Sequence, residues 1–288
     1  MQRTSNLLNW ILFVALSFIW GSSFILMKEG MRQLTPYQVA SIRMLSAGLV
    51  LMPFAVKRRN HINRKRGYII LSGLLGSFIP AFLFCIAETR IDSALAGILN
   101  ALTPICVIIV GALAFQHRST RNQIAGVIIG FAGLLLLFAS SATINFGYIS
   151  YALLVLLATL SYGINVNMVN RVLTDIRSVD IAAFAFTSLI LPAALVLWYT
   201  GFFQLDLKSP DMFWSIGASA LLGITGTAVA TILFYVLLKK AGPIFSTMVT
   251  YGIPFVALFW GALAGESITF LQIGCLILIL GGVYVSRR

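Results

Sequence analysis

Two short runs carry residues whose types and spacing suit polar contacts inside an apolar segment. Asn100-Ala-Leu-Thr-Pro104 and Thr250-Tyr-Gly-Ile-Pro254 lie 150 positions apart. A proline within a helix has no N–H to donate, so Pro104 leaves the carbonyl of Asn100 without its helical partner, and Pro254 does the same to Thr250. In hydrocarbon an unsatisfied carbonyl costs several kcal/mol, so it is tolerated only against protein, water or a ligand. For either proline alone, a kink needed only for packing is the alternative interpretation.

Two further segments combine an aromatic residue with a hydrogen-bonding one. Trp20-Gly-Ser-Ser23 and Tyr162-Gly-Ile-Asn165 each place the two groups three positions apart. Residues i and i+3 share one face of a helix, so each segment presents both groups in the same direction. The predicted binding site comprises these four residues together with Asn100, Pro104, Thr250, Tyr251 and Pro254.

Arg43 and Glu88 are ionisable residues within or beside apolar segments. Arg43 stands about seven residues into its segment, where a charge is costly unless it pairs or reaches the interface. We expect a structural ion pair between Arg43 and Glu29, Glu88 or Asp92, and direct contact with a ligand is the alternative. Glu88 is the acidic residue best placed for a proton-linked step, but an uncoupled mechanism needs no titrating group and is preferred.

The composition indicates an integral membrane protein. Of the 288 residues, 59% are hydrophobic and 10% charged, and the mean hydropathy is +0.97. The net charge of +12 lies in short loops between apolar runs, a pattern that records membrane orientation, so we expect contact with membrane lipid and none with nucleic acid. The three cysteines, Cys85, Cys106 and Cys275, occupy separate apolar runs and predict neither a disulfide framework nor a zinc site.

Ten apolar runs are long enough to cross a bilayer, for which about 20 residues are needed. The sequence therefore predicts an all-α, polytopic membrane protein with helices over residues 7–28, 36–56, 68–87, 92–114, 122–140, 148–170, 179–200, 213–238, 243–264 and 268–286. The first run has features of a cleaved signal peptide, but its removal would leave nine helices and break a repeat. We expect it to be retained.

The spacing of 150 residues indicates an internal repeat, because Leu83-Phe84 also matches Leu233-Phe234. We place its two halves at residues 1–143 and 144–288, with five helices in each. Because five is odd, the second half enters the membrane from the opposite side, and the repeat is inverted. Secondary transporters with inverted repeats hold their substrate near the midplane, between the halves.

The basic residues predict the orientation. If the N-terminus is cytoplasmic, fifteen of the 20 lysines and arginines lie in cytoplasmic segments, four lie outside and Arg43 lies within a helix. Cytoplasmic loops are the ones enriched in basic residues. We therefore expect both termini and the loop at residues 57–66 on the cytoplasmic side of a bacterial cytoplasmic (inner) membrane.

The fifth and tenth predicted helices, 122–140 and 268–286, have faces of small residues with almost no polar groups. Such faces allow helices to pack closely. We assign them to a scaffold or a homodimer contact rather than to substrate. The residues concerned are Gly126, Gly130, Gly133, Gly274, Gly281 and Gly282.

With these features in place, the sequence resembles the drug/metabolite transporter superfamily, in its ten-helix EamA-type branch. The resemblance rests on Trp20-Gly-Ser-Ser-Phe24 with Lys28, on Arg43, on Ala94 through Pro104, and on Gly261 through Glu266 with Gln272 to Gly282. It implies a secondary transporter, commonly an exporter of amino acids or related metabolites, with a central cavity framed by both halves. Gln116 departs from the pattern, because such chains often carry an acidic residue there.

Three classes of function compete. A secondary carrier of a small metabolite, such as an amino acid or related amphipathic solute that is exported or exchanged by alternating access, explains the inverted repeat and the lack of a GxxxxGK[ST] loop. A channel or lipid-handling membrane protein is the alternative, although a ring of like charges would be expected of a channel. An enzyme is not expected, because His61 and His117 fall in predicted loops and no two carboxylates meet at membrane depth. No cofactor or metal is expected.

Overall fold

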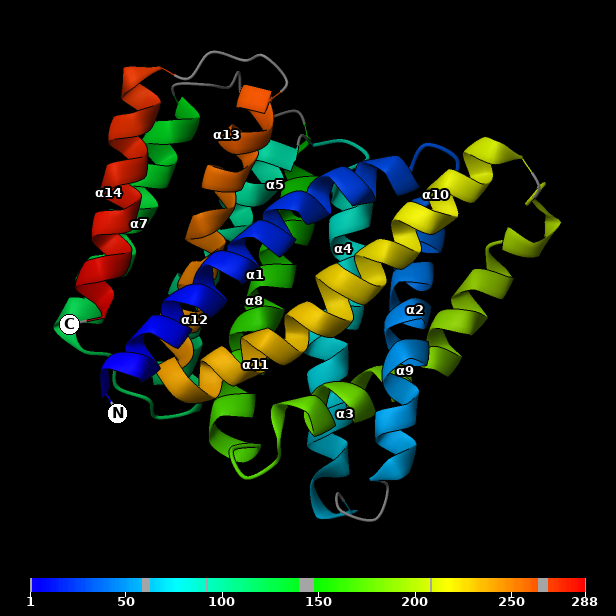
Figure 1. Ribbon diagram of the computed structural model, residues 1–288, viewed down its shortest axis with the longest axis horizontal. Coiled ribbons are helices and arrows are strands. Elements are labelled where there is room, and N and C mark those ends of the chain that lie inside the picture. Colours follow the sequence, from blue (N-terminus) through cyan, green and yellow to red (C-terminus); the bar gives the residue numbers. More distant parts are fainter. Residues whose placement is uncertain are drawn as a thin grey trace.

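The ten predicted membrane segments are largely helical where the computed structural model describes them, over residues 2–58, 63–91, 93–139, 148–207, 209–263 and 269–287 (Figure 1). The first half contains α1 (Gln2–Gly30), α2 (Pro36–Lys57), η2 (Asn63–Lys65), α3 (Arg66–Gly73), η3 (Leu74–Phe78), α4 (Ile79–Ala87), α5 (Ser93–Asn100), α6 (Thr103–Ala114) and α7 (Arg121–Ala139). The second half contains α8 (Ile149–Val172), α9 (Ser178–Tyr199), η5 (Phe202–Gln204), α10 (Pro210–Leu221), η6 (Leu222–Val229), α11 (Ala230–Ala241), α12 (Pro243–Thr247), η7 (Met248–Gly252), α13 (Ile253–Leu263) and α14 (Phe270–Ser286). Within the described ranges there is no strand.

Eight helical stretches of the described chain are long and apolar enough to cross a membrane, and the shorter apolar helices α7 and α14 complete the set of ten. The prediction of an all-α polytopic membrane protein is confirmed. Four spans consist of consecutive pieces. The third and eighth contain the π-helical segments η3 and η6, and the fourth and ninth are interrupted beside Pro104 and Pro254.

The first helices of the two halves run in opposite directions. In Figure 1, α1 leaves the end of the molecule where the N- and C-termini are marked, whereas α8 runs back toward that end. The loop between α8 and α9 lies at the same end as the termini, and the loop between α9 and α10 lies at the other. Five spans per half give this inverted arrangement, as the odd number of helices predicts.

Local sequence fixes the start of α2 and of α14. The side chain of Thr35 accepts a hydrogen bond from the Gln38 N–H at 3.4 Å, and the Gln38 side chain accepts one from the Thr35 N–H at 2.9 Å. Thr269 and Gln272 make the same reciprocal pair, at 3.3 and 2.8 Å. Each pair satisfies two N–H groups that the first helical turn leaves without partners.

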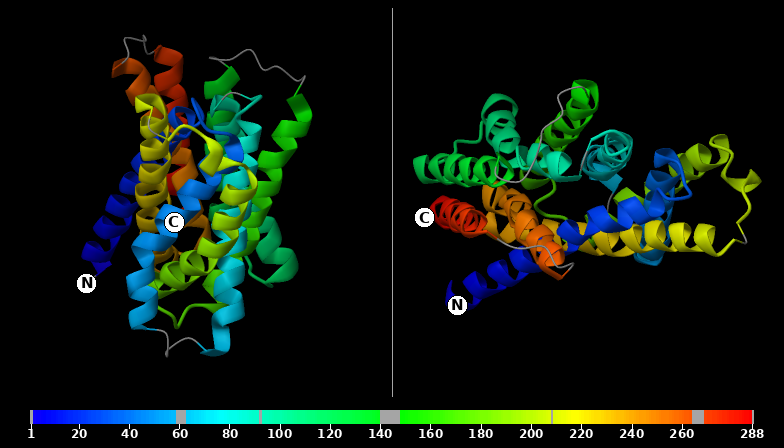
Figure 2. Two further views of the ribbon diagram at one scale, coloured as in Figure 1. Left: turned by 90° about the vertical axis from the view of Figure 1, so that its right-hand side faces the viewer. Right: turned by 90° about the horizontal axis from the view of Figure 1, so that it is seen from above.

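α7 and α14 lie side by side along one edge of the molecule, and α2 and α9 form the opposite edge (Figure 2). The predicted small-residue faces are the contact between α7 and α14 within one chain. A Cβ on Gly126 would lie 2.5 Å from the Gly282 carbonyl oxygen, and a Cβ on Gly133 would lie 3.1 Å from the Ile279 nitrogen. Gly274 and Gly281 are exposed and have no described neighbour within 4 Å. A homodimer through this outward face stays a prediction.

A loop contact ties the first half to the second at the end where the termini lie. The Lys65 Nζ donates to the Val172 carbonyl oxygen at 2.8 Å and to Asp175 Oδ1 at 2.6 Å. The hydrogen bond from Lys65 lowers the pKa of the Asp175 carboxyl from its ordinary value.

Candidate substrate cavity

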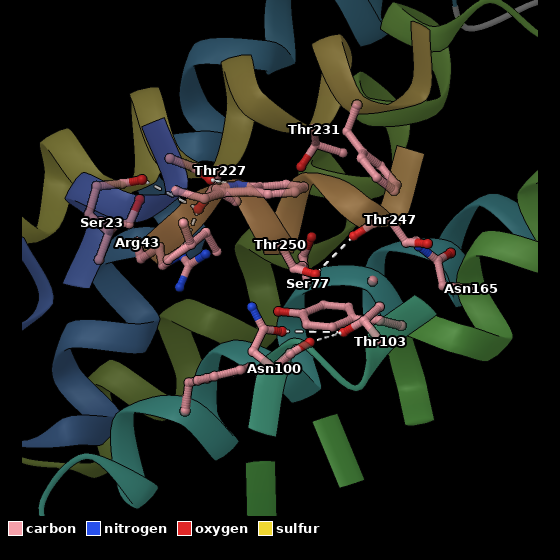
Figure 3. Close-up of a pocket in the computed structure, with 18 of the residues that line it drawn as sticks. Ser23, Arg43, Ser77, Asn100, Thr103, Asn165, Thr227, Thr231, Thr247 and Thr250 are labelled. Atoms are coloured by element: carbon pink, nitrogen blue, oxygen red, sulfur yellow. Dashed lines mark hydrogen bonds between the residues drawn. The ribbon is translucent and has the colours of Figure 1, made fainter. Parts of the chain in front are cut away.

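A cavity of about 120 Å³ lies between the two halves (Figure 3). Its walls come from α1, α2, η3, α4, α5 and α6 of the first half and from α8, η6, α11, α12, η7 and α13 of the second. A buried water needs roughly 10–15 Å³ of such volume, so the space is large enough for more than a single water. The polar lining is made mostly of hydroxyl and amide groups, among aromatic and aliphatic side chains.

The structure brings together most of the residues predicted from the sequence. Seven of them line the cavity: Trp20, Ser23, Arg43, Asn100, Tyr162, Asn165 and Thr250. The other four are not among the described residues of its wall: Glu88, Pro104, Tyr251 and Pro254. That the seven bind substrate stays a prediction.

The break in the fourth span places Asn100 at the cavity. Asn100 is the last residue of α5, and the next helix begins at Thr103 with Pro104 in its first turn. The Thr103 hydroxyl donates to the Asn100 carbonyl oxygen at 2.5 Å. The proline starts a helix rather than kinking one, and the carbonyl left without a helical partner is satisfied by a hydroxyl of the same chain.

The ninth span repeats this break with a tighter turn. Thr250 lies in η7, and Pro254 is the second residue of α13. The Thr250 carbonyl accepts a hydrogen bond from the Ile253 N–H, so it too is satisfied within the turn. The Thr250 hydroxyl donates to the Thr247 carbonyl at 2.9 Å. Both carbonyls thus have a partner within the chain, and the lining residues Asn100 and Thr250 also carry polar side chains.

Tyr251 does not face the cavity, contrary to the prediction. Its side chain is fully buried, and its hydroxyl donates to the Val127 carbonyl of α7 at 3.1 Å. The ring rests where a Cβ on Gly130 would be, 2.6 Å from the nearest ring atom. Consecutive residues of a helical turn point in different directions, and here Thr250 faces the cavity while Tyr251 packs against α7. The glycine face of α7 provides the space for the tyrosine.

Arg43 reaches the cavity from α2 and is held by a hydroxyl. Its Nε donates to Thr227 Oγ1 at 2.6 Å. Glu29, a predicted ion-pair partner, instead binds Arg32 at 2.9 Å. In the described part of the chain Arg43 forms no ion pair with Glu29 or Glu88, and the third candidate, Asp92, lies outside the described residues.

Two aromatic pairs join the halves symmetrically. Trp20 of α1 lies 5.4 Å from Phe234 of α11, measured between ring centroids, and Tyr162 of α8 lies 6.3 Å from Phe84 of α4. The two phenylalanines are 150 positions apart, and Trp20 and Tyr162 occupy matching positions of the first helix of each half. Each pair therefore consists of one ring from each half, and all four residues line the cavity.

The π-helical segments η3 and η6 add lining residues that the sequence analysis missed. Gly76 and Ser77 of η3 match Gly226 and Thr227 of η6 at the spacing of 150, and all four line the cavity. A Cβ on Gly226 would lie 2.7 Å from the Ser23 hydroxyl, and one on Gly76 would collide with the Asn165 amide. Trp20 also donates from its indole N–H to the Gly226 carbonyl at 3.1 Å. The Gly-Ser pair of the first half and the Gly-Thr pair of the second, 150 positions apart, are the sequence signal from which this part of the cavity wall could have been predicted.

These features suit recognition of a solute rather than covalent chemistry. The lining offers hydroxyls, amides, one guanidinium and aromatic faces. Nowhere in the described ranges do three His, Cys, Asp or Glu side chains gather to hold a metal ion. Apolar walls with a few placed polar groups are the usual composition of a small-molecule site.

The comparisons with known proteins cover almost the whole chain. The profile of the EamA-like transporter family matches residues 8–139 and again residues 149–288. An "Uncharacterized transporter" of Archaeoglobus fulgidus is 24% identical over 97% of this chain and 99% of its own. A "Probable amino-acid metabolite efflux pump" of Salmonella typhimurium is 24% identical over 93% and 91%, and the "Uncharacterized inner membrane transporter YedA" of Escherichia coli K12 is 25% identical over 90% and 83%.

A solved structure described only as "Crystal structure of protein" has the same fold. It superposes with a TM-score of 0.73 at 17% sequence identity and covers 99% of this chain and 96% of its own. The repeated family match, the ten helices and the cavity between the halves agree. The chain belongs to the EamA-like transporter family and is a membrane transporter rather than an enzyme.

Proposed function

We propose that this protein is a secondary carrier that moves a small amphipathic metabolite, an amino acid or related solute, across the bacterial inner membrane by alternating access. The observation that carries the proposal is the cavity between the halves, whose walls come from matching segments of both together with α2 of the first half. Inverted-repeat transporters bind their substrate where the repeats meet.

Two relatives support the substrate class and the location. The Salmonella relative is named as an amino-acid metabolite efflux pump and the Escherichia coli relative as an inner membrane transporter. The cavity wall supports an amphipathic solute, because Trp20, Tyr162 and Phe234 offer aromatic faces and Asn100 offers an amide. Export, or exchange of one solute for another, fits the names of these two relatives.

The proposed movement uses the halves 1–143 and 144–288 as the two units that tilt. The breaks at Asn100 and in η7 divide one span of each half into two pieces. The aromatic pairs Trp20–Phe234 and Tyr162–Phe84 each join one half to the other. Loosening one pair while the other stays closed would open the cavity to one side at a time.

We propose exchange or facilitated diffusion without proton coupling. Among the described residues that line the cavity there is no carboxylate, and a proton relay through the membrane commonly uses one. Glu88, at the end of α4, is the alternative carrier of a coupling proton.

Counterflow in liposomes tests the proposal. A thermal-shift screen of metabolites on the detergent-purified protein first selects a solute that stabilises it, since binding favours the folded state. Liposomes loaded with unlabelled solute should then accumulate the labelled solute transiently, with a saturable initial rate that an imposed pH gradient leaves unchanged. A rate that stays linear with concentration and shows no counterflow would indicate a channel, and acceleration by the pH gradient that Glu88→Gln removes would establish proton coupling.

A further inference from the structure

Arg43 is the one formally charged residue among the described residues that line the cavity. Its Nε is engaged by Thr227 Oγ1 at 2.6 Å, whereas its two terminal nitrogens form no hydrogen bond with a described residue. Figure 3 shows the guanidinium pointing into the space that Asn100 borders. The donors that remain free are therefore the ones aimed at a ligand.

The fold holds this arginine in place from the other half of the molecule. η6 contributes Thr227, and its Gly223 lies against the backbone of α2, where a Cβ would be 3.0 Å from the Arg43 carbonyl carbon. The missing side chain lets α2 approach η6 closely enough for the Thr227 hydroxyl to reach Nε. The Nε of the guanidinium is thereby held by Thr227, and its two terminal nitrogens stay available to a ligand.

A fixed positive charge in a low-dielectric space is costly without a counter-charge, and an intramembrane charge of this kind indicates a functional site. The guanidinium fork matches the geometry of a carboxylate, which it binds through two parallel N–H···O hydrogen bonds. Since the described lining contains no acidic side chain, the counter-charge that the cavity lacks is one that a bound solute can bring.

We propose that the cavity selects solutes that carry a carboxylate, which binds the terminal nitrogens of Arg43 while the apolar body of the solute lies among the aromatic side chains. Thr227 is a positioning residue that acts through Arg43. This inference rests on the proposed carrier function and assigns its substrate class. Amino acids and simple monocarboxylates share the recognised group, and amines or neutral amides do not.

The test is a set of matched pairs in which only the carboxylate changes. The probes are 3-phenylpropanoate with 3-phenylpropanamide, hexanoate with hexanamide, and L-leucine with L-leucinamide, titrated into detergent-purified protein and measured by calorimetry. We expect each carboxylate to bind more tightly than its amide, by roughly ten- to a hundredfold, the range for hydrogen bonds to charged groups. If no carboxylate in the series binds more tightly than its amide, the proposal is wrong. Tighter binding of L-leucine without the simple acids would restrict the class to amino acids.

Three variants assign the preference to Arg43. Arg43→Gln should reduce the ratio of carboxylate to amide affinity to roughly one while amide binding persists, and Arg43→Lys should retain part of it because the charge remains. Thr227→Val removes a hydrogen bond from the charged guanidinium and should lower the ratio severalfold without bringing it to one, because the charge that binds the carboxylate remains. Arg32→Gln, an exposed arginine paired with Glu29 outside the cavity, is the matched control and should leave the ratio unchanged.

The parent protein keeps the proposal testable if Arg43→Gln fails to fold, because the ratio measured on the parent alone decides the substrate class. An unchanged ratio in a folded Arg43→Gln variant would overturn the role of Arg43. Counterflow of amines in place of carboxylates would leave the carrier function standing and reject this inference. Tight carboxylate binding without any counterflow would support this inference and reject the carrier function.

Discussion

Asn100 shows how a single residue couples the helix break to the cavity. The Thr103 hydroxyl satisfies its carbonyl and also approaches its side-chain oxygen at 3.4 Å, so the amide NH2 is the group that remains for a ligand. Pro104, four residues further on, is the feature of the sequence that predicted this residue. The Thr103 hydroxyl replaces the hydrogen bond that Pro104 cannot donate, which the spacing of the residues alone does not reveal.

Asn100→Ala should weaken substrate binding by roughly two- to twelvefold, because a hydrogen bond to a polar ligand contributes about 0.5–1.5 kcal/mol. Calorimetric titration of the solute that supports counterflow measures the change. The control is Asn170→Ala, which removes the same amide near the end of α8, at a position that is not part of the described cavity wall. Equal affinities of the Asn100→Ala variant and the parent would remove Asn100 from the site.

At the scale of elements, the broken fourth and ninth spans are the parts proposed to move. Pro104→Ala would supply an N–H that can reach the Asn100 carbonyl and so favour a continuous helix across the break. We expect slower counterflow with affinity mostly unchanged, seen as a lower maximal rate at constant half-saturation.

Pro53→Ala is the matched control for the proline, because Pro53 lies inside α2 on an exposed face of the helix. It should leave the rate as it is. A Pro104→Ala variant that exchanges solute as fast as the parent would separate the break from the transport cycle.

The contact between α7 and α14 makes a second prediction at this scale. A Cβ on Gly282 would lie 2.6 Å from the Gly126 carbonyl oxygen, so Gly282→Ala should force the helices apart. Overpacking of this kind typically destabilises by about 1–3 kcal/mol, measured as a lower thermal midpoint in detergent. The neighbouring Gly281→Ala, which meets no described atom within 4 Å, should leave the midpoint unchanged or raise it. A drop of equal size in both variants would contradict the assigned contact.

The elements themselves were largely predictable and the details of their packing were not. Hydrophobic length fixed the ten spans, because a bilayer demands about 20 apolar residues wherever they occur. The spacing of 150 residues between matching motifs indicated the internal repeat. The Tyr251 side chain points toward α7 because Gly130 leaves space for it there. The hydrogen-bond partner of Arg43 is Thr227, which lies 184 positions away in the sequence. Both are contacts between distant segments, which a reading along the chain cannot supply.

At the scale of the whole molecule, both halves are needed to build one cavity. The orientation of the chain in the membrane decides which end of the cavity faces the cytoplasm. We expect the termini and the loop between α8 and α9 in the cytoplasm. In cysteine-free protein, a membrane-impermeant thiol reagent added outside intact cells should label Leu207→Cys and miss Thr174→Cys, since both positions are exposed loop residues. Labelling of position 174 instead of 207 would invert the orientation.

The central claim is that solute crosses the membrane through the cavity between the halves. Its most direct test is a single cysteine at Thr231, a partly exposed residue of the cavity wall, with Cys85, Cys106 and Cys275 replaced. Before labelling, the protein should support counterflow. A water-soluble methanethiosulfonate reagent should abolish counterflow, and saturating solute should slow the labelling. Thr174→Cys, in the loop, should be labelled with neither effect. Full counterflow by completely labelled Thr231→Cys protein would contradict the account.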